Sequence, residues 1–375
     1  MRLCYVSLVR LPTDRAHGYA IMKMCEQFAA EGASVELYVP TRSHGIKDDP
    51  FTYYGINRSF IIRKLWATDI LGRFENVRAA FALDQLTFLL SLLTKRFSGS
   101  IMYTRDYQVA LFARSQHIVL EIHSIPERSF LFLKALARAK KLVVISNGIK
   151  QELVERGVPA GKILVAHDAV DPAEFNVVPN RDLWRPYRVD PNKKIVLYTG
   201  HFYGWKGADT LAEAASHLPT DVEVVLMGGV DKELADFKKR YENESVHVIG
   251  FQPRDRIPTL LKSADVLVLP NSATPKISSH YTSPLKLFQY MASGIPIVAS
   301  DVPSSREILS DETASWFKPD DEQSLAETIE HVLSHPDEAR AKAVRAKEEA
   351  KKYTWDARAR GILDHIVLGG VPVFG

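Results

Sequence analysis

Short, almost uninterrupted apolar runs recur along this chain and limit its fold more than any other feature. They are apolar at nearly every position rather than at alternate positions, which is typical of parallel strands buried on both faces. Helical patterns lie between them, and alternating strands and helices predict a doubly wound α/β architecture. The runs span residues 3–9, 34–40, 117–123, 141–147, 162–168, 193–200, 222–229, 246–251, 265–270 and 295–300.

The series of runs divides near residues 177–194. This stretch is rich in proline, asparagine and charge, so we expect a linker there. A chain of 375 residues agrees with two domains. We predict Rossmann-like domains at 1–178 and 190–350, followed by a helical segment at 351–375. Ligands of such sheets bind outside the carboxyl ends of the strands, so a site between the domains is expected.

Composition indicates a cytoplasmic enzyme. The chain is 46% hydrophobic with a net charge of +3, which is ordinary for a globular protein and far from the density of a nucleic-acid binder. The two cysteines, Cys4 and Cys25, fit neither a disulfide framework nor a zinc site and are expected in the core. The amino-terminal apolar run is too short for a signal peptide, and the apolar stretch at 81–97 is too short to cross a bilayer.

One candidate anion site follows the run at 193–200. Two glycines and Lys206 precede a helix there, so a positive side chain and free helix amides coincide. The spacing is not that of a P-loop. A surface lysine in a glycine turn is the alternative.

A second candidate is the stretch "SPLK". Ser283 is expected to cap a helix that has Pro284 at its first position. The amides of Leu285, Lys286 and Leu287 would then lack helical partners and could bind an anion. An ordinary capped helix is the alternative.

Further candidates lie in the first half of the chain. Gly18, between the first strand and the first helix, would let a phosphate or sugar approach the backbone, although no GxGxxG motif is present. His123 follows a buried strand, and Arg105 follows a shorter apolar run. A structural histidine is the alternative for His123. Serine-hydrolase and zinc-protease motifs are absent, and no DxD-like cluster suggests a metal, so we expect neither metal nor cofactor.

Taken together, these segments resemble the GT4 family of retaining glycosyltransferases, and the resemblance covers nearly the whole chain. The family implies the GT-B fold, with two Rossmann-like domains facing across a cleft and a terminal helix crossing back to the first domain. It also implies a nucleoside diphosphate sugar as donor. The matching segments are 20–40, 143–175, 198–214, 283–309 and 353–363.

The resemblance assigns roles to several residues. Lys206 matches the lysine that contacts the donor diphosphate, and His201 stands where the family commonly has arginine. Gly18 matches the glycine of the loop that meets the donor from the other domain. His123 matches the histidine near the reacting sugar, where we expect it to position substrate rather than act as an obligatory base. Ser283, Leu285 and Lys286 would complete donor binding.

The chain departs from the family at its paired glutamates. Gln289 stands at the position whose glutamate contacts the nucleotide ribose, and Tyr281 stands at the other. A glutamine accepts one hydrogen bond and donates another, so it can still hold a diol. Losing a charge-assisted bond would cost about 1–2 kcal/mol of donor affinity.

The function expected is retaining transfer of a sugar from a nucleoside diphosphate to an acceptor hydroxyl, in glycan or glycolipid synthesis, by a hexosyltransferase-type enzyme (EC 2.4). Two alternatives stay open: an epimerase of related fold, and a sugar nucleotide binding protein of weak activity. The acceptor, a saccharide or a lipid-linked sugar, is unassigned, and Arg105 is a candidate to bind it. Residues 59–97 mix aromatic, leucine and basic residues, so they could contact the inner membrane face. Core helices with a basic outer side are the alternative.

Overall fold

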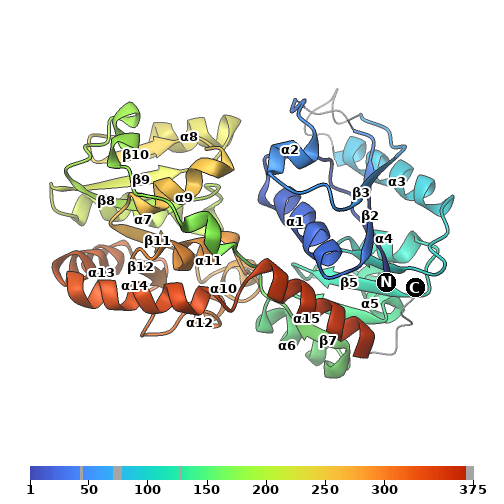
Figure 1. Ribbon diagram of the computed structural model, residues 1–375. Helices are drawn as coiled ribbons and strands as arrows, with labels where there is room; N and C mark the ends of the chain where they lie inside the picture. Colours follow the sequence, from blue (N-terminus) through green and yellow to red (C-terminus); the bar gives the residue numbers. More distant parts are fainter. Residues whose placement is uncertain (43–44, 71–77, 127–128, 369–375) are drawn as a thin grey trace. The chain divides into compact units, whose positions relative to one another are not determined.

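The computed structural model describes residues 1–42, 45–70, 78–126 and 129–368. They form two compact units, each a parallel sheet with helices packed on it (Figure 1). The first unit comprises Met1–Ile145, Ile149–His167 and the chain from Trp355 onward, and the second comprises Ser146–Gly148 and Asp168–Thr354. The predicted doubly wound α/β class is confirmed.

The first unit has a seven-stranded parallel sheet among its described residues, in the order β3-β2-β1-β4-β5-β6-β7. This order brings the carboxyl ends of β1, β4 and β5 side by side. The strands are β1 (Arg2–Val6), β2 (Ser34–Pro40), β3 (Ile61–Leu65), β4 (Ile101–Thr104), β5 (Ile118–Ile122), β6 (Lys141–Val144) and β7 (Ile163–Val165). The helices are α1 (Ala16–Ala30), α2 (Pro50–Tyr54), α3 (Arg78–Leu93), α4 (Tyr107–Phe112), α5 (Phe130–Arg138), α6 (Asn147–Glu155), η1 (Ala160–Lys162) and α15 (Trp355–Leu368).

The second unit has a six-stranded parallel sheet among its described residues, in the order β10-β9-β8-β11-β12-β13. The strands are β8 (Lys194–Thr199), β9 (Val222–Met227), β10 (Val246–Ile249), β11 (Val266–Leu269), β12 (Ile297–Ser300) and β13 (Ser315–Phe317). The α-helices are α7 (Ala208–Ala214), α8 (Asp231–Tyr241), α9 (Ile257–Lys262), α10 (Lys276–Ser279), α11 (Leu285–Ser293), α12 (Pro303–Arg306), α13 (Glu322–Ser334) and α14 (Pro336–Ala350). The 3-10 turns are η2 (Pro172–Phe175), η3 (Arg181–Tyr187), η4 (Gly204–Lys206), η5 (Ala215–His217) and η6 (Arg254–Arg256).

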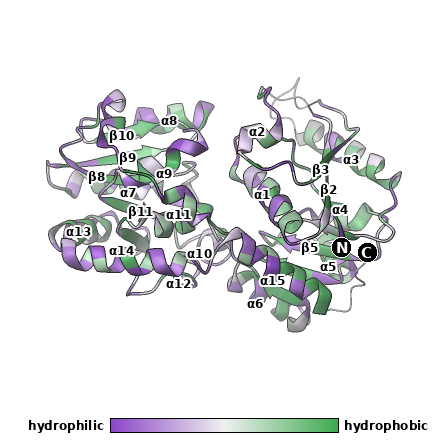
Figure 2. Cartoon of the chain, in the orientation of Figure 1, coloured by the Kyte–Doolittle hydropathy of each residue, from purple (hydrophilic) through white to green (hydrophobic). Residues whose placement is uncertain are grey.

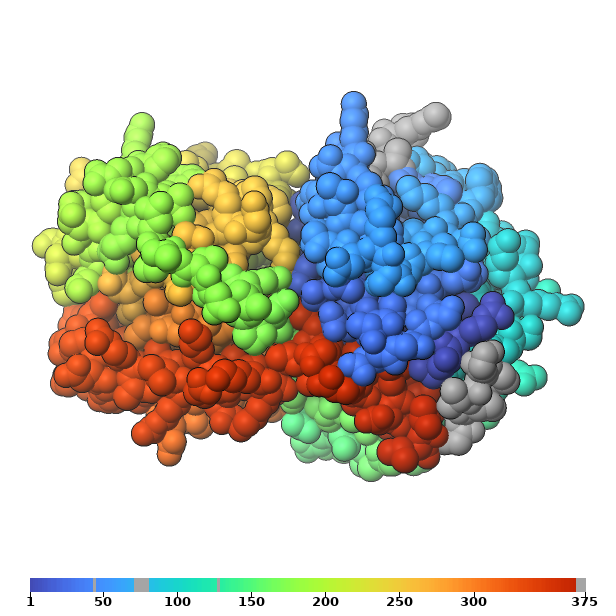
Figure 3. All heavy atoms as spheres, viewed as in Figure 1, coloured from blue at the N-terminus to red at the C-terminus, as the bar shows by residue number. Residues whose placement is uncertain are grey.

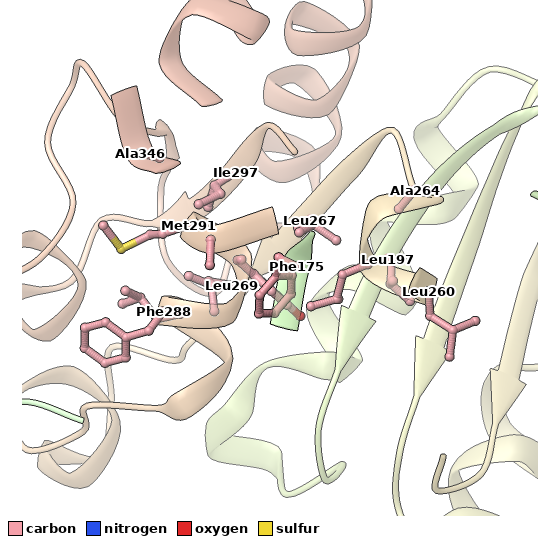
Figure 4. Packing of buried hydrophobic residues seen from close by; sticks show 14 of the residues in the cluster. Phe175, Leu197, Leu260, Ala264, Leu267, Leu269, Phe288, Met291, Ile297 and Ala346 are labelled. Atoms are coloured by element: carbon pink, nitrogen blue, oxygen red, sulfur yellow. The ribbon is translucent and has the colours of Figure 1, made fainter. Parts of the chain in front are cut away.

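Apolar side chains fill the space between each sheet and its helices. In the second unit, Phe175, Leu197 and Leu269 point toward one another in the cluster that Phe288 and Met291 of α11 complete (Figure 4). The strands are mainly apolar, and hydrophilic stretches gather on helices such as α14 (Figure 2). That helix lies at the surface of its unit (Figure 3). Packing on the sheet therefore fixes where α11 begins, and α11 carries several of the predicted site residues.

The ten apolar runs of the sequence all form strands, but three further strands escaped prediction. β3 and β13 lie at the edges of their sheets, where one side has no neighbouring strand. β3 exposes most of its side chains, and β13 is only three residues long. β4 has four residues, all buried. Short or half-exposed strands lack the long apolar run that marks a buried one.

The linker predicted at residues 177–194 is wrong. Most of this stretch is the turn η3 and its flanks, inside the second unit. The reason is Trp184, whose side chain is fully buried and whose indole N–H donates to the Ser263 carbonyl at 3.0 Å. One tryptophan can anchor a stretch whose composition otherwise suggests a linker.

Cys4 and Cys25 are buried free thiols, as expected. Burial raises the pKa of both, well above the ordinary value for Cys25. Among the described residues, no helix combines the length and the apolar character needed to cross a bilayer.

Candidate active site

Two glycines in and beside the loop after β8 leave no room for a side chain. Gly207 has a φ of 71°, and a Cβ there would lie 1.6 Å from the Pro270 carbonyl oxygen. Gly228, which follows β9, would place a Cβ 2.1 Å from the Gly200 carbonyl oxygen. The loop therefore packs backbone to backbone against its neighbours and sets the position of Lys206 at the end of η4, just before α7.

Lys206 lies among aromatic rings. Its Nζ is 5.3 Å from the Tyr203 ring centroid and 5.2 Å from that of Trp205. Burial lowers the pKa of Lys206, and the Glu233 carboxylate opposes that shift. The Lys206 ammonium is thus partly desolvated, and cation–π interactions with the two rings favour its charged form.

Lys286, in the first turn of α11, is more deeply buried at its tip. Its Nζ lies 3.8 Å from the Tyr198 ring centroid and has no hydrogen-bond partner among the described residues. It also approaches Gly200, since a Cβ there would lie 3.0 Å from Nζ. Burial, and then the charge of Lys206, hold the pKa of Lys286 well below its ordinary value. A buried cation beside a second cation, without a hydrogen bond, is the environment that a bound anion would stabilise.

The start of α11 differs from the prediction. Pro284, not Ser283, is the N-cap residue, and no side chain caps the helix. Ser283 Oγ accepts a hydrogen bond from the Asp168 amide at 3.0 Å, because the chain turns to bring that loop beside it. The Leu287 amide donates to the Pro284 carbonyl at 2.9 Å. The amides of Leu285 and Lys286 have no partner in the described part of the chain, so an anion could bind there.

His201 has a partner that the sequence did not reveal. Its Nδ1 lies 2.9 Å from Glu233 Oε2, and its ring stacks on Tyr203 with an interplanar angle of 2°. Glu233 also accepts a hydrogen bond from the Phe202 amide at 2.6 Å. Glu233 thus orients the loop, and its place in the first turn of a helix after a buried strand was the signal that could have found it.

Gln289 lies one turn beyond Lys286 on α11, so the two side chains share a face of the helix. Gln289 is half-buried, and its amide group forms no hydrogen bond to other residues of the described ranges. The next residue, Tyr290, is fully buried and its hydroxyl accepts from the Thr199 amide at 2.8 Å. The helix therefore leaves the Gln289 amide available on the face that also carries Lys286.

In the first unit, His123 and Arg105 come together at the carboxyl ends of neighbouring strands. Arg105 follows β4, His123 follows β5, and Arg105 Nη2 lies 2.9 Å from His123 Nδ1. His123 Nε2 lies 2.5 Å from Glu121 Oε1. Glu121 is a charged residue inside an otherwise apolar strand, and that break in the pattern could have identified it.

Gly18 is explained by packing. A Cβ there would lie 2.2 Å from the Tyr54 hydroxyl and 2.6 Å from Thr13 Cγ2, so packing alone already requires a glycine at this position. The neighbouring residue, His17, is closer to the predicted cluster. Burial, and then Arg105, Arg15 and His123, lower the pKa of His17 to about 4. His17 directly precedes Gly18, and sequence reasoning overlooked it.

The predicted residues therefore form two groups, each within one unit. The second unit brings together Lys206, Lys286 and the start of α11, with His201 and Gln289 nearby. The first unit brings together His123 and Arg105. Across the described ranges, no cluster of three or more potential side-chain metal ligands occurs.

The second unit matches a known family. Residues 181–353 fit the profile described as "Glycosyl transferases group 1". We call this stretch, which is less than half of the chain, the group 1 domain because of its similarity to that family. Over this stretch the resemblance inferred from the motifs is confirmed, and both lysines, His201 and Gln289 lie within it.

Curated relatives of the chain include two whose names refer to polysaccharide biosynthesis. The chain is 27% identical over 212 residues to amylovoran biosynthesis glycosyltransferase AmsK of Erwinia amylovora, covering 54% of this chain and 50% of the relative. It is 25% identical over 214 residues to putative colanic acid biosynthesis glycosyltransferase WcaL of Escherichia coli K12, covering 55% and 50%. The aligned region thus spans about half the length of each relative.

Solved structures match the fold of both units. Anabaena HepE, crystallised with UDP-glucose, matches with a TM-score of 0.75 at 17% identity, covering 98% of this chain and 100% of that chain. Sucrose-phosphate synthase of Thermosynechococcus elongatus matches with a TM-score of 0.76 at 19% identity, covering 98% and 99%. The group 1 domain and the first unit are therefore the two Rossmann-like domains of the GT-B fold.

Proposed function

We propose that this protein is a retaining glycosyltransferase that moves a hexosyl group from a nucleoside diphosphate sugar to an acceptor hydroxyl in glycan or glycolipid synthesis. One observation carries the proposal: the buried Lys286 ammonium, without a hydrogen bond, next to Lys206 and the open start of α11. Two cations and two free amides match the charge of a diphosphate. HepE, whose fold this chain shares, was crystallised with UDP and with UDP-glucose.

In this reaction the bond between the anomeric carbon and the diphosphate oxygen breaks, and the acceptor oxygen bonds to the same carbon and face. Negative charge develops on the leaving diphosphate, where Lys206 and Lys286 would stabilise it. The leaving phosphate takes the acceptor's proton, so no protein nucleophile, metal or cofactor is required. His123 and Arg105 would position the sugar or the acceptor. Gln289 would bind the ribose, and His201, held by Glu233, would support the diphosphate loop.

The test is binding of uridine diphosphate by calorimetry, together with transfer assays. Lys286→Met should weaken binding by about 10- to 100-fold, because one charge-assisted hydrogen bond is lost. Lys238→Met is the matched control, since Lys238 is an exposed lysine of the same unit that pairs with Glu242. Equal affinity of the Lys286 variant and wild type would contradict the proposal. Conversion of donor in the absence of acceptor would favour an epimerase, and binding without any transfer would favour a sugar nucleotide binding protein.

The acceptor side of the proposal includes contact with an anionic membrane surface, peripheral and on the cytoplasmic side. Helix α3 has an inner and an outer side: Phe88 and Leu92 are buried, whereas Leu83, Leu86 and Leu90 are exposed. Residues 71–77, part of the predicted contact region, lie outside the described residues. Helix α4 packs against both α3 and α5. Helix α5 adds more exposed apolar residues, namely Phe130, Leu131 and Leu133.

Charge on and beside these helices favours anionic lipid. Between residues 81 and 140, every exposed charged side chain that the structure describes is a cation: Lys95, Arg96, Arg114, Lys134, Arg138 and Lys140. Exposed apolar side chains with cations around them are typical of segments that lie on a membrane.

Co-sedimentation with vesicles tests this contact. Wild type should bind vesicles that contain phosphatidylglycerol more tightly than phosphatidylcholine vesicles, and less tightly as salt rises. Phe130→Ser with Leu131→Ser should weaken binding. Val178→Ser, at an apolar residue that is 82% exposed in the other unit, is the control. An affinity for vesicles that does not depend on lipid charge would contradict the contact. So would an affinity that is unchanged by the Phe130 and Leu131 substitutions.

A further inference from the structure

Glu121 is a buried carboxylate whose two oxygens are both occupied. Oε2 accepts a hydrogen bond from the Tyr103 hydroxyl. Oε1 accepts from Arg358 Nη2 at 2.9 Å and lies 2.5 Å from His123 Nε2. The Glu121 and Arg358 side chains are only 3% and 4% exposed. Burial alone would raise the pKa of Glu121, but Arg358, His123 and Arg105 hold it well below its ordinary value. Glu121 is therefore a carboxylate at neutral pH.

The partners of His123 define its tautomer. A guanidinium can only donate, so His123 Nδ1 must accept the hydrogen bond from Arg105 Nη2. The ring proton then resides on Nε2 and is donated to Glu121. An imidazole with one accepting and one donating nitrogen is neutral. Among the described residues, the other charged or titratable groups near His123, Glu121 or their neighbour His17 include Tyr5, Asp14, Arg15, Tyr103, Asp106 and Arg358.

Arg358 is itself rigidly held. Its Nε donates to the His167 carbonyl at 2.8 Å, so both sides of the guanidinium are fixed. Its helix, α15, packs against α1, and the Trp355 ring meets Tyr19 edge-on with centroids 5.8 Å apart. Because the Arg358 side chain is fixed at two points, it can hold the Glu121 carboxylate in one position. The Glu121 carboxylate in turn sets the position of the His123 ring that it contacts.

We propose that Arg358 and Glu121 are positioning residues, which hold His123 as its neutral Nε2–H tautomer and thereby aim the Arg105 guanidinium. This rests on the glycosyl transfer proposed above. His123 then leaves the acceptor's proton to the leaving phosphate, because Arg105 already engages its Nδ1 lone pair. The function of the network is to present a fixed cation, Arg105, and not a general base.

The first test is spectroscopic and needs no turnover. In protein labelled with ¹⁵N-histidine, His123 is assigned from the signals that disappear in His123→Asn. At pH 7, wild type should show a protonated Nε2 and an unprotonated Nδ1. Arg358→Met should give a mixture of tautomers. Arg360→Gln, at an exposed arginine of the same helix that pairs with Glu31 and Asp356, should leave the spectrum unchanged. An imidazolium in wild type, or an unchanged His123 signal in Arg358→Met, would overturn the proposal.

The second test separates positioning from folding. Should Arg358→Met fail to fold, the double variant Glu121→Gln, Arg358→Met removes both buried charges and should recover the urea midpoint. Positioning predicts that its kcat stays about 100-fold low while KM for the donor is unchanged. A purely structural role predicts that kcat recovers with stability. If no donor supports transfer, the proposed function fails, and the tautomer measurement still decides the positioning.

Discussion

The Lys286 ammonium lies 3.8 Å from the centroid of the Tyr198 ring and has no hydrogen-bond partner among the described residues. Its pKa is held well below the ordinary value of 10.5 by burial and by Lys206. Between that lowered pKa and 10.5 the unfolded chain binds the extra proton, so this group makes stability rise with pH. A bound diphosphate would favour the charged ammonium and reverse the shift.

Diphosphate binding should therefore take up a proton. The measurement is calorimetric titration with pyrophosphate near pH 9, in buffers of different ionisation enthalpy. Wild type should show an apparent enthalpy that depends on the buffer, and Lys286→Met should lose most of that dependence. If the apparent enthalpy of Lys286→Met depended on the buffer as strongly as that of wild type, Lys286 would not be the group that takes up the proton.

Gln289→Glu should raise the affinity for uridine diphosphate. A carboxylate can accept from both ribose hydroxyls, whereas the amide accepts one and donates one. A gain of about 1–2 kcal/mol corresponds to roughly 5- to 30-fold. Pyrophosphate, which has no ribose, is the control ligand, and its affinity should fall slightly because of the added negative charge. An equal loss for both ligands would show that Gln289 does not contact the ribose.

Gly207→Ala should destabilise the second unit strongly. The residue has a φ of 71°, and the added Cβ would meet the Pro270 carbonyl oxygen at 1.6 Å. We expect a loss of about 3–4 kcal/mol in the free energy of unfolding, from strain and backbone displacement together. Gly204→Ala is the matched control in the same loop, because nothing lies within 4 Å of its added Cβ. Similar urea midpoints for the two variants would contradict the close approach.

His17 should make the protein sensitive to mild acid. Its pKa falls from 6.5 to about 4 on folding, so between those values the unfolded chain binds more protons. Its contribution to stability is therefore present above 6.5 and is lost as the pH falls toward 4. His17→Gln should flatten the decline in melting temperature between pH 6.5 and 4, compared with wild type. His217→Gln, at an exposed histidine of the other unit, should leave the slope as it is.

Sequence predicted the fold well where one local pattern was enough. The long apolar runs identified strands buried on both faces, but β3 and β13, at sheet edges, lack that pattern. Trp184 shows how composition alone can mislead. The stretch around it was predicted to be a linker, but the single buried side chain of Trp184 makes it part of a hydrophobic core.

At the candidate site, motif position predicted Lys206, Lys286 and His123, whose neighbours come from nearby strand ends. Partners brought in by the tertiary fold were missed. Glu233 meets His201 across 32 positions, and Arg358 meets Glu121 across 237. Ser283 was predicted to be a helix cap from the local sequence. Its hydroxyl instead accepts a hydrogen bond from the amide of Asp168, 115 positions away. Contacts between residues so far apart in the sequence produce no local pattern from which a single sequence could predict them.

The ion pair between Arg358 and Glu121 also sets an order of assembly. Glu121 and the sheet around it leave the ribosome long before Arg358, because the whole second unit is translated in between. Until then a carboxylate destined for burial has no guanidinium beside it, and α1 has no α15 to cover it. The first unit therefore cannot be completed until the second unit has been translated.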